Sequence, residues 1–550
     1  MPHNYESPIY IPIQAPPELA AGLANLSLGP NAHRIDYKYQ RLLNLFRRHA
    51  LSNKRKAMLR RRALHATPAT KSIKSGTTPA HGEKKGLLST SAALKGRVAV
   101  GNENIWEEEI ISPTLLNNML ETSDNPDEKT FKRRVADLFS LALEDQAPLA
   151  EENLFIERLS GAMTNSVYRI TAIHPTPSDG GANAHTEAGS GPTNKSKYLL
   201  RVYGIGVDEF LVRNQELYWL RQLSELNIGP HLYAIFGNGR IEEYLESATL
   251  NEGDIRDPST SRHIARRMCE LHWLVNFYAP HAEKTPEEKL DPMLKGVDLS
   301  GKPQLWINLD HWHQLLREKA DTLRRVCHNN RECLEIIENL GQLRADTERL
   351  KEAIRRVNSP IVFSHNDLQY GNILRLTKDN ELVVVDFEYA GYNYRGFDIV
   401  NHFCEWMSNY NHPTHPHAFD ISQYPTKQER YRFLRTYLKT KIFLDANRPA
   451  DRHVVESEET EEPYVTKSHM IPVHIDTEYL DQQVPLLDEE VQSFFAARLL
   501  HWGVWGLLQA CSSDIDFNYV EYANQHLREF RKALPELLAK FSLDGNLASS

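Results

Sequence analysis

Apolar and polar positions alternate along several short segments between residues 153 and 245. Alternation combined with β-branched and aromatic residues is typical of β-strands. It predicts five strands, at residues 155–159, 166–173, 198–203, 232–236 and 240–244. Apolar residues at helical spacing predict one helix before these strands, at residues 127–144, and another among them, at residues 207–226. Together these elements indicate a small, strand-rich lobe over residues 103–245.

After about residue 246 the apolar positions follow the 3.6-residue period of an amphipathic helix. The pattern predicts helices at residues 259–278, 306–326, 331–357 and 488–511. Two short apolar runs, residues 361–363 and 382–385, interrupt this helical pattern and are predicted to be strands. Residues 246–545 are therefore expected to form a larger, mostly helical lobe.

Three segments lack such periodicity. Residues 1–102 are rich in Pro, Ala, Ser and Thr, residues 174–195 in Gly, Ser and Pro, and residues 447–483 are acidic and irregular. Segments of this composition bury too little apolar surface to fold, so all three are predicted to be disordered. Residues 38–62 carry ten Lys or Arg and no acid, which favours a solvated basic tail. Weak contact of this tail with an anionic membrane surface is the alternative.

Composition narrows the class of protein. A length of 550 residues predicts two lobes, not one core. The 41% of hydrophobic and 25% of charged residues are ordinary for a soluble globular chain, and the formal charge of −9 argues against nucleic acid as the partner. Five cysteines without a CxxC pair, the lack of an apolar run of 18 residues and the lack of a signal-like N-terminus favour a cytoplasmic protein.

The two short strands of the helical lobe are each followed by a carboxylate, Asp367 and Asp386, and Asn372 lies between them. In phosphoryl transfer, one carboxylate accepts a hydroxyl proton while an Asn oxygen and a second carboxylate hold Mg2+ on the phosphates. The alternative is a hairpin whose turn contains Asp and Asn only for turn chemistry. We favour phosphoryl transfer because further residues also stand where a kinase site would want them: His365, Leu368 and Phe387.

Three features of the strand-rich lobe suit a nucleotide. A turn of small residues, 160–166, joins the first two strands, and the backbone N–H groups of such a turn can bind phosphate, although most such turns only connect strands. Arg201 ends an apolar run where a phosphate-binding cation would be useful. Glu216 could pair with Arg201, although two separate surface charges are the commoner outcome for an Arg and a Glu. Residues 243–245 form a possible hinge whose backbone could bind a nucleotide base.

The segments SHNDLQYGNIL (residues 364–374) and VVDFEYAGYNYRGFDIVNHFCEWM (residues 384–407) resemble the motifs of the choline/ethanolamine kinase family. The resemblance covers residues 103–545, and the basic first hundred residues look more like the fungal members. It implies an α+β, bilobal fold like that of protein kinases, with a small β-rich N-lobe and a larger, mostly helical C-lobe. It further implies ATP as donor, Mg2+ as cofactor, choline or ethanolamine as acceptor, and a homodimer.

The same resemblance implies roles for individual residues. Asp367 would be the catalytic base and would contact the acceptor. Asn372 and Asp386 would hold Mg2+, with support from Glu388. The residues of the ATP site would be Ser160, Gly161, Met163, Thr164, Asn165, Arg201, Glu243, Leu245 and Gln369. Two positions depart from ordinary protein kinases, with Glu388 where a Gly usually follows the Phe and Arg201 in place of a Lys. The family is expected to show both departures.

The end of the chain offers a pocket for the acceptor. A quaternary ammonium cannot donate hydrogen bonds, so proteins hold it with aromatic faces and a carboxylate. The family pattern matches an aromatic set, in which the two tryptophans are three residues apart on one helix face: Trp502, Trp505, Phe517 and Tyr522. Glu405 and Tyr410 follow the second motif and could approach the same place. A patch of aromatic core is the alternative.

Two glycines interrupt this predicted aromatic helix, Gly503 and Gly506. Each costs about 1 kcal/mol relative to Ala in a helix interior. We therefore expect another backbone or the ligand to approach the helix closely at these positions.

These features predict an ATP-dependent choline kinase that makes phosphocholine for phosphatidylcholine biosynthesis and also uses ethanolamine. The nearest alternative is an ethanolamine kinase with choline as the secondary substrate. A catalytically inactive, kinase-like binding protein and a phosphotransferase for aminoglycosides or small alcohols are further alternatives. A buried ion pair of Arg395 and Asp398 is predicted to stabilise the loop after the metal site. Asn401 and His402 are predicted to support the site without contacting the substrate.

Overall fold

The computed structural model describes most of the chain after residue 96. The described residues are 97–100, 103–106, 126–142, 150–159, 165–174, 194–203, 213–226, 228–275, 301–446, 475–513 and 515–542. The predicted basic tail, the interior of the 174–195 insertion and residues 447–474 of the acidic insertion lie outside them.

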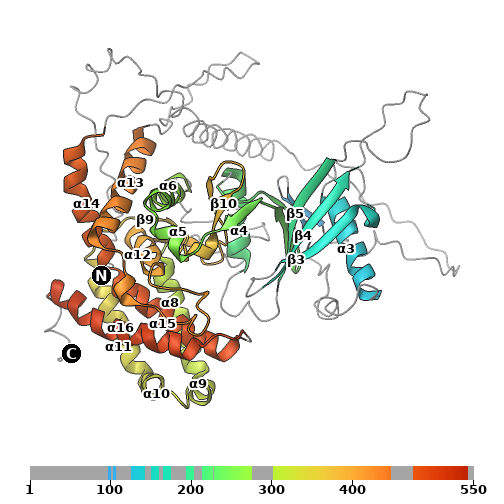
Figure 1. Cartoon of the computed structure of the whole chain (residues 1–550). Coiled ribbons are helices and arrows are strands. Elements are labelled where there is room, and N and C mark those ends of the chain that lie inside the picture. Colours follow the sequence, from blue (N-terminus) through green and yellow to red (C-terminus); the bar gives the residue numbers. More distant parts are fainter. Residues whose placement is uncertain are drawn as a thin grey trace, which may run out of the picture. The chain divides into compact units, whose positions relative to one another are not determined.

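The N-terminal part of the described chain is built on a seven-stranded sheet (Figure 1). Its strands are β1 (Arg97–Val100), β2 (Glu103–Trp106), β3 (Leu154–Leu159), β4 (Asn165–His174), β5 (Asn194–Tyr203), β6 (Leu232–Phe236) and β7 (Gly239–Glu243). The order is β1-β2-β6-β7-β5-β4-β3, and all neighbours are antiparallel except the parallel pair β2 and β6. The five strands predicted from alternation are therefore confirmed within a few residues.

The core of this part lies between the sheet and helix α3 (Pro126–Ala142), which covers one face of β3, β4 and β5 in Figure 1. Phe131, Val135 and Phe139 of α3 are buried against Tyr168 and Tyr198 of the sheet. Their spacing along the helix places them on one face, which is why the helical pattern of this segment was readable from the sequence.

The C-terminal part of the described chain is mostly helical. Its helices are α5 (Glu252–Arg256), α6 (Pro258–Leu274), α8 (Gln304–Glu318), α9 (Ala320–Val326), α10 (Arg331–Glu338), α11 (Leu340–Arg355), α12 (Arg395–Glu405), α13 (Lys427–Ala446), α14 (Thr477–Gln492), α15 (Phe495–Ser512) and α16 (Tyr519–Lys540). Two small sheets lie among them, β8 (Ser247–Thr249) with β10 (Ile373–Leu376) and β11 (Leu382–Val384), and β9 (Ile361–Ser364) with β12 (Gly391–Tyr394). This division into a sheet-containing part and a helical part is the predicted α+β architecture.

Several predicted boundaries were wrong. The segments 306–326 and 331–357 are each two helices, broken at Lys319 and Asn339. The segment 488–511 spans the end of α14 and most of α15, because the chain leaves the helix at Ser493 and Phe494. An amphipathic pattern continues through such breaks, since both helices bury their apolar faces on the same side.

The predicted disordered segments are also shorter than expected where the chain is described. β1 lies inside residues 1–102, β4 and β5 reach His174 and Asn194, and α14 begins at Thr477, inside residues 447–483. In α14 the buried residues Leu480, Val484 and Leu487 recur at helical spacing. The acidic residues between them had concealed this pattern.

Helices α15 and α16 pack closely at the two glycines singled out in the sequence. A Cβ atom on Gly503 would lie 2.7 Å from the side chain of Leu527, and one on Gly506 would lie 2.9 Å from Cδ1 of Tyr522. Even an alanine at either position would therefore require the side chain of Leu527 or Tyr522 of α16 to move. The prediction that a neighbouring element approaches here is confirmed.

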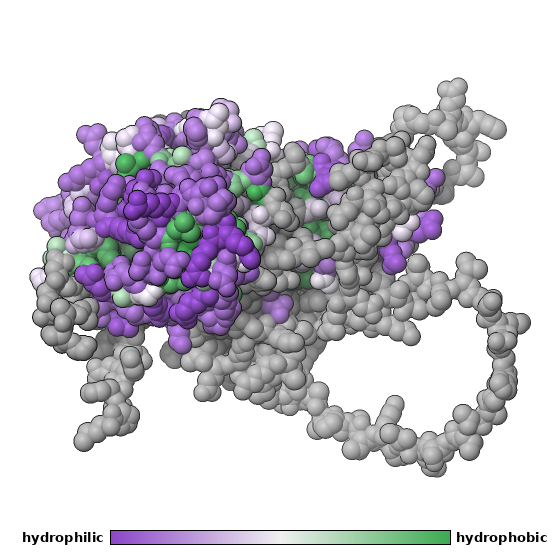
Figure 2. All heavy atoms as spheres, turned by 90° about the horizontal axis from the view of Figure 1, so that it is seen from below, coloured by the Kyte–Doolittle hydropathy of each residue, from purple (hydrophilic) through white to green (hydrophobic). Residues whose placement is uncertain are grey.

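The described surface carries few large exposed hydrophobic side chains. Figure 2 shows hydrophilic side chains over most of the described part of one face, with small hydrophobic patches between them. The large exposed hydrophobic residues among those described are Phe155, Val326, Ile421, Tyr479 and Leu486. No helix within the described ranges is long and apolar enough to span a bilayer.

Candidate active site

The three residues of the predicted phosphoryl-transfer cluster come together. Asp367 lies in the loop after β9, and the chain then turns through Tyr370–Asn372 into β10. The Asn372 side-chain amide donates to the Asp367 carbonyl oxygen at 2.9 Å and to its carboxylate at 3.0 Å. The backbone N–H of Val385 donates to the Asn372 carbonyl at 3.0 Å, which places Asp386 beside the same turn.

The residue before Asp367 holds this loop in a conformation that side chains rarely adopt. Asn366 has φ of 64°, and its backbone N–H donates to Asp398 Oδ1 at 2.7 Å. Its side-chain amide donates to the carbonyl of Tyr389 at 2.9 Å, and its side-chain oxygen accepts from Asn393 at 2.8 Å. These contacts offset the strain of the left-handed conformation, so the loop has one well-defined geometry.

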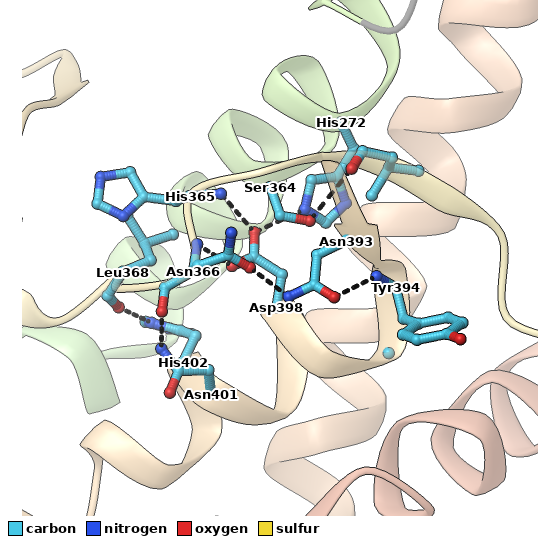
Figure 3. Close-up of polar contacts among 12 residues, drawn as sticks. His272, Ser364, His365, Asn366, Leu368, Asn393, Tyr394, Asp398, Asn401 and His402 are labelled. Atoms are coloured by element: carbon cyan, nitrogen blue, oxygen red, sulfur yellow. Dashed lines mark hydrogen bonds and ion pairs between the residues drawn. The ribbon is translucent and has the colours of Figure 1, made fainter. Parts of the chain in front are cut away.

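Asp398 anchors the loop from below (Figure 3). Its Oδ2 atom accepts from the backbone N–H of His365 at 3.1 Å and lies 2.9 Å from His272 Nε2. Burial acts to raise the pKa of this carboxyl, but the bonds from His272 and the loop outweigh it and lower the pKa below its ordinary value. The predicted Arg395–Asp398 pair is thus wrong, because Arg395 pairs with Glu490 of α14 instead.

Carboxylates surround Asp367. Its own partial burial, followed by the charges of Glu405, Glu388 and Asp386, raises its pKa well above the ordinary value for an aspartate. A group with a raised pKa is better suited to accept a proton from an alcohol. Asp386, like Asn366, has a positive φ, of 65°.

The cluster also suits a divalent cation. Within the described part of the chain, no group of three or more His, Cys, Asp or Glu side chains makes a complete metal site by itself. Mg2+ prefers oxygen ligands and usually takes one or two carboxylates together with substrate phosphates and water. The incomplete oxygen set of Asn372 and Asp386, with Glu388 close to Asp367, fits that mode of binding.

The predicted aromatic residues form one cluster, which includes a tyrosine that sequence reasoning missed. Its ring centroids are 5.5 Å apart for Tyr389 and Trp502, 5.3 Å for Trp502 and Trp505, and 5.8 Å for Phe517 and Tyr522. Trp505 Nε1 donates to the Tyr389 hydroxyl at 2.9 Å. Because Trp505 and Phe517 are only half-buried, the cluster is not a closed piece of core. Tyr389 stands three residues after Asp386, and this closeness to the metal motif was the available signal.

A buried carboxylate lies next to the aromatic cluster. Glu405 accepts a hydrogen bond from the Tyr410 hydroxyl at 2.8 Å and pairs with Arg498 of α15 at 2.8 Å. Its charge acts on both Asp367 and Tyr522. Glu405 and its partner Tyr410 therefore lie beside the aromatic cluster, and Arg498 is a further charged neighbour that the sequence did not indicate.

On the nucleotide side the structure describes only some of the predicted residues. Ser160, Gly161, Met163 and Thr164 lie outside the described residues. Asn165 begins β4, and Glu243 ends β7 with its carboxylate bonded to the backbone N–H of His231 at 3.1 Å. The Leu245 carbonyl accepts from the Ser247 hydroxyl at 3.0 Å. Gln369 is half-buried in the loop that carries Asp367.

The predicted pairing of Arg201 with Glu216 was wrong. Glu216 of α4 (Arg213–Leu226) instead pairs at 2.8 Å with Arg240 of β7, which is fully buried and also contacts Glu242. Arg201 lies directly across the β-ladder from Arg240, and its Nε atom is buried with no hydrogen-bond partner within the described residues. Among the described residues, the Arg201 guanidinium is therefore not committed to an ion pair with Glu216.

Comparison with known proteins gives a consistent result. The family model "Choline/ethanolamine kinase" matches residues 156–531. "Probable choline kinase 2" of Arabidopsis thaliana is 31% identical over 423 residues, which are 76% of this chain and 97% of that protein. The choline kinase of Schizosaccharomyces pombe is 32% identical over 399 residues, 70% of this chain and 76% of that protein. In the solved structures, an ethanolamine kinase of Plasmodium vivax has a TM-score of 0.52 at 23% identity, over 76% of this chain and 94% of that one, so the fold is shared.

Proposed function

The chain belongs to the choline/ethanolamine kinase family, and we propose that it transfers the γ-phosphoryl group of ATP to choline, with ethanolamine as a second acceptor. The observation that supports choline is the half-open aromatic cluster around Trp502 and Trp505, beside the carboxylates of Asp367 and Glu405. Aromatic faces attract a quaternary ammonium through their π-systems, and a neighbouring carboxylate balances its charge. A primary ammonium fits the same cluster, which explains the second acceptor.

In the proposed reaction Asp367 orients the acceptor hydroxyl and takes its proton. The hydroxyl oxygen forms a bond to the γ-phosphorus, the bond between that phosphorus and the bridging oxygen breaks, and ADP leaves. The hydrogen bond from Asn372 holds the Asp367 carboxylate in place during this step. Its raised pKa brings it closer to neutral pH, which favours proton transfer to a carboxylate.

The phosphates are held from both parts of the protein in this proposal. Asn372 and Asp386 would bind Mg2+, with Glu388 in support, and the ion when bound would neutralise charge on the phosphate oxygens. Arg201 supplies a cation from β5, and the lack of a hydrogen-bond partner for its Nε–H among the described residues supports this role. Glu216 forms its ion pair with Arg240 and so leaves Arg201 available to the phosphates.

The test is an acceptor comparison with the purified full chain. Formation of ADP is measured with choline, with ethanolamine and with dimethylbutanol, the neutral isostere of choline. We expect the highest kcat/KM for choline and a large loss for the neutral alcohol. Asp367→Asn should lower kcat by about 10²-fold or more, because it removes the base and keeps the shape.

Two results would count against this proposal. A higher kcat/KM for ethanolamine would make the chain an ethanolamine kinase with choline secondary, a preference also carried by the name of a 27% identical relative, "Probable ethanolamine kinase" of Arabidopsis thaliana. Full turnover by Asp367→Asn would remove Asp367 from its role. The homodimer, the cytoplasmic location and the membrane contact of residues 38–62 remain predictions from the sequence.

A further inference from the structure

We propose that Asn401 is a positioning residue that fixes the separation between the aromatic cluster and Asp367, and thereby sets the length of acceptor that is phosphorylated. This inference rests on the proposed function and goes beyond it, since it names the residue that determines which distance between ammonium and hydroxyl the site accepts. Choline carries its hydroxyl and its ammonium two carbons apart. A site that holds both ends must keep its two binding groups at one distance.

A chain of hydrogen bonds joins the two ends of the site. Trp502 Nε1 of α15 donates to Asn401 Oδ1 of α12 at 2.7 Å. The Asn401 side-chain amide then donates to the carbonyl of Asn366 at 3.1 Å, a bond drawn in Figure 3. Asn366 is covalently joined to Asp367. The ring that faces the ammonium is therefore connected to the carboxylate that faces the hydroxyl through a single side chain.

A second path runs parallel to the first and ends at the same residue. Trp505 donates to the Tyr389 hydroxyl, and the Tyr389 carbonyl accepts from the Asn366 side chain. Both tryptophans are thus linked to Asn366 by hydrogen bonds, Trp502 through Asn401 and Trp505 through Tyr389. The Asn401 path is the one to test, because a single buried side chain makes both of its bonds.

The connection through Asn401 is rigid. Asn401 is fully buried, Asn366 is 2% exposed and Trp502 is 5% exposed. Both polar atoms of the Asn401 side chain are engaged, since Oδ1 also accepts from Arg498 Nε at 3.4 Å. A buried amide with both ends satisfied has little freedom to move, because each displacement would leave a donor or acceptor unpaired. In reactions that need near-attack geometry, a misplacement of about 1 Å can cost about 10²-fold in rate.

Two variants interrupt the path at different bonds. Asn401→Asp keeps the oxygen that accepts from Trp502 and loses the amide that donates to Asn366. Trp502→Phe keeps an aromatic ring and loses the indole N–H. Each is tested with choline and with its three-carbon homologue, hydroxypropyl-trimethylammonium. The wild-type chain should strongly prefer choline, measured as the ratio of the two kcat/KM values.

We expect both variants to lower kcat for choline about tenfold, as the loss of one buried hydrogen bond implies. The ratio of kcat/KM values should fall towards one, because the homologue suffers less from a loosened separation. The KM for ATP should stay unchanged. The double variant should lose less than the product of the two single losses, since both interrupt one path.

The matched control is Asn339→Asp, at the junction of α10 and α11. Its side-chain amide also donates to a backbone carbonyl, that of Glu335 at 2.8 Å, but in an exposed place. It should change neither kcat nor the acceptor ratio. Equal losses for both acceptors in Asn401→Asp and Trp502→Phe, with an unchanged ratio, would overturn the inference, as would unchanged kcat. A wild-type chain that does not phosphorylate choline would instead overturn the proposed function.

Discussion

The Nε2 atom of His272 on α6 lies 2.9 Å from Oδ2 of Asp398 on α12, and both side chains are fully buried. On its other side, His272 Nδ1 lies 2.7 Å from the Tyr437 hydroxyl, which also accepts a hydrogen bond from Trp273 Nε1 at 2.9 Å. An indole nitrogen can only donate. The Tyr437 hydroxyl hydrogen can bond His272 Nδ1, and a neutral His272 with its hydrogen on Nε2, facing the Asp398 carboxylate, satisfies all three groups.

The substitution Tyr437→Phe therefore tests how much this hydrogen-bond network contributes to stability and to kcat. The substitution keeps the ring and leaves Trp273 Nε1 and His272 Nδ1 without their shared partner, which should cost about 1–3 kcal/mol of unfolding free energy. Urea denaturation measures the loss. Because the network ends at Asp398, which bonds to the backbone of the loop carrying Asp367, kcat should fall as well.

The control for this prediction is Tyr479→Phe on α14, whose side chain is 44% exposed. It should change stability by less than about 0.5 kcal/mol. If the two tyrosine variants lose the same stability, the network through Tyr437 does not contribute as inferred here.

A second prediction concerns the attraction of the aromatic cluster for charge. Trp505→Leu keeps an apolar side chain and removes the π-system, so it should raise the KM for choline by about 30-fold, the equivalent of a desolvated cation–π contact of about 2 kcal/mol. The KM for ATP should not change. The neutral isostere dimethylbutanol provides the control, since its KM should change far less. A parallel rise for choline and for the neutral alcohol would assign Trp505 to packing alone.

The sequence was sufficient for the parts of the site that lie close together along the chain. Asp367, Asn372 and Asp386 occur within one short segment, and local strand and turn signals were enough to predict that they come together. Arg498 and Tyr437 gave no such signal. Their partners lie on helices about a hundred residues or more away, and only the packing of α12 against α15 and of α6 against α13 brings them together.

The pairing of Arg201 with Glu216 failed for a similar reason. Arg201 and Arg240 are direct neighbours across β5 and β7, so either could face Glu216 of α4. Which of them does so depends on how α4 lies on the sheet, and strand periodicity carries no information about that. The glycines of α15 could be interpreted from the sequence, because the low helix propensity of glycine is a local property. The close packing of α16 explains why glycine stands at these positions.

A third prediction follows from that packing. Gly506→Ala should displace α16, because the added Cβ would meet Tyr522 Cδ1 at 2.9 Å and Ala523 Cβ at 3.1 Å. Since Tyr522 belongs to the aromatic cluster, the KM for choline should rise and stability should fall by about 1–3 kcal/mol. Gly341→Ala in α11 is the matched control, with nothing within 4 Å of the added atom. Because Gly341 lies in the first turn of α11, the substitution should stabilise the protein by less than about 1 kcal/mol, and a similar gain for Gly506→Ala would contradict the close approach.

A fourth prediction concerns the pH dependence of stability. Burial, and then the charge of Arg498, lowers the pKa of His501 to about 3. Both of its ring nitrogens are buried without a hydrogen-bond partner in the described part of the chain. A histidine whose folded pKa is below its unfolded value of about 6.5 favours the folded state fully above pH 6.5. That contribution is lost as the pH falls through 6.5 towards 3, because only the unfolded state then binds the proton.

His501→Phe removes this pH dependence. The phenyl ring can keep the contacts with Trp312 and Phe397, whose centroids lie 4.6 Å and 5.5 Å from that of His501. Between pH 8 and pH 5 the wild-type chain should lose about 2 kcal/mol more unfolding free energy than the variant. Urea denaturation at the two pH values measures the difference. Parallel losses would mean that His501 is protonated in the folded protein at pH 5, which would require a partner for its charge inside the core.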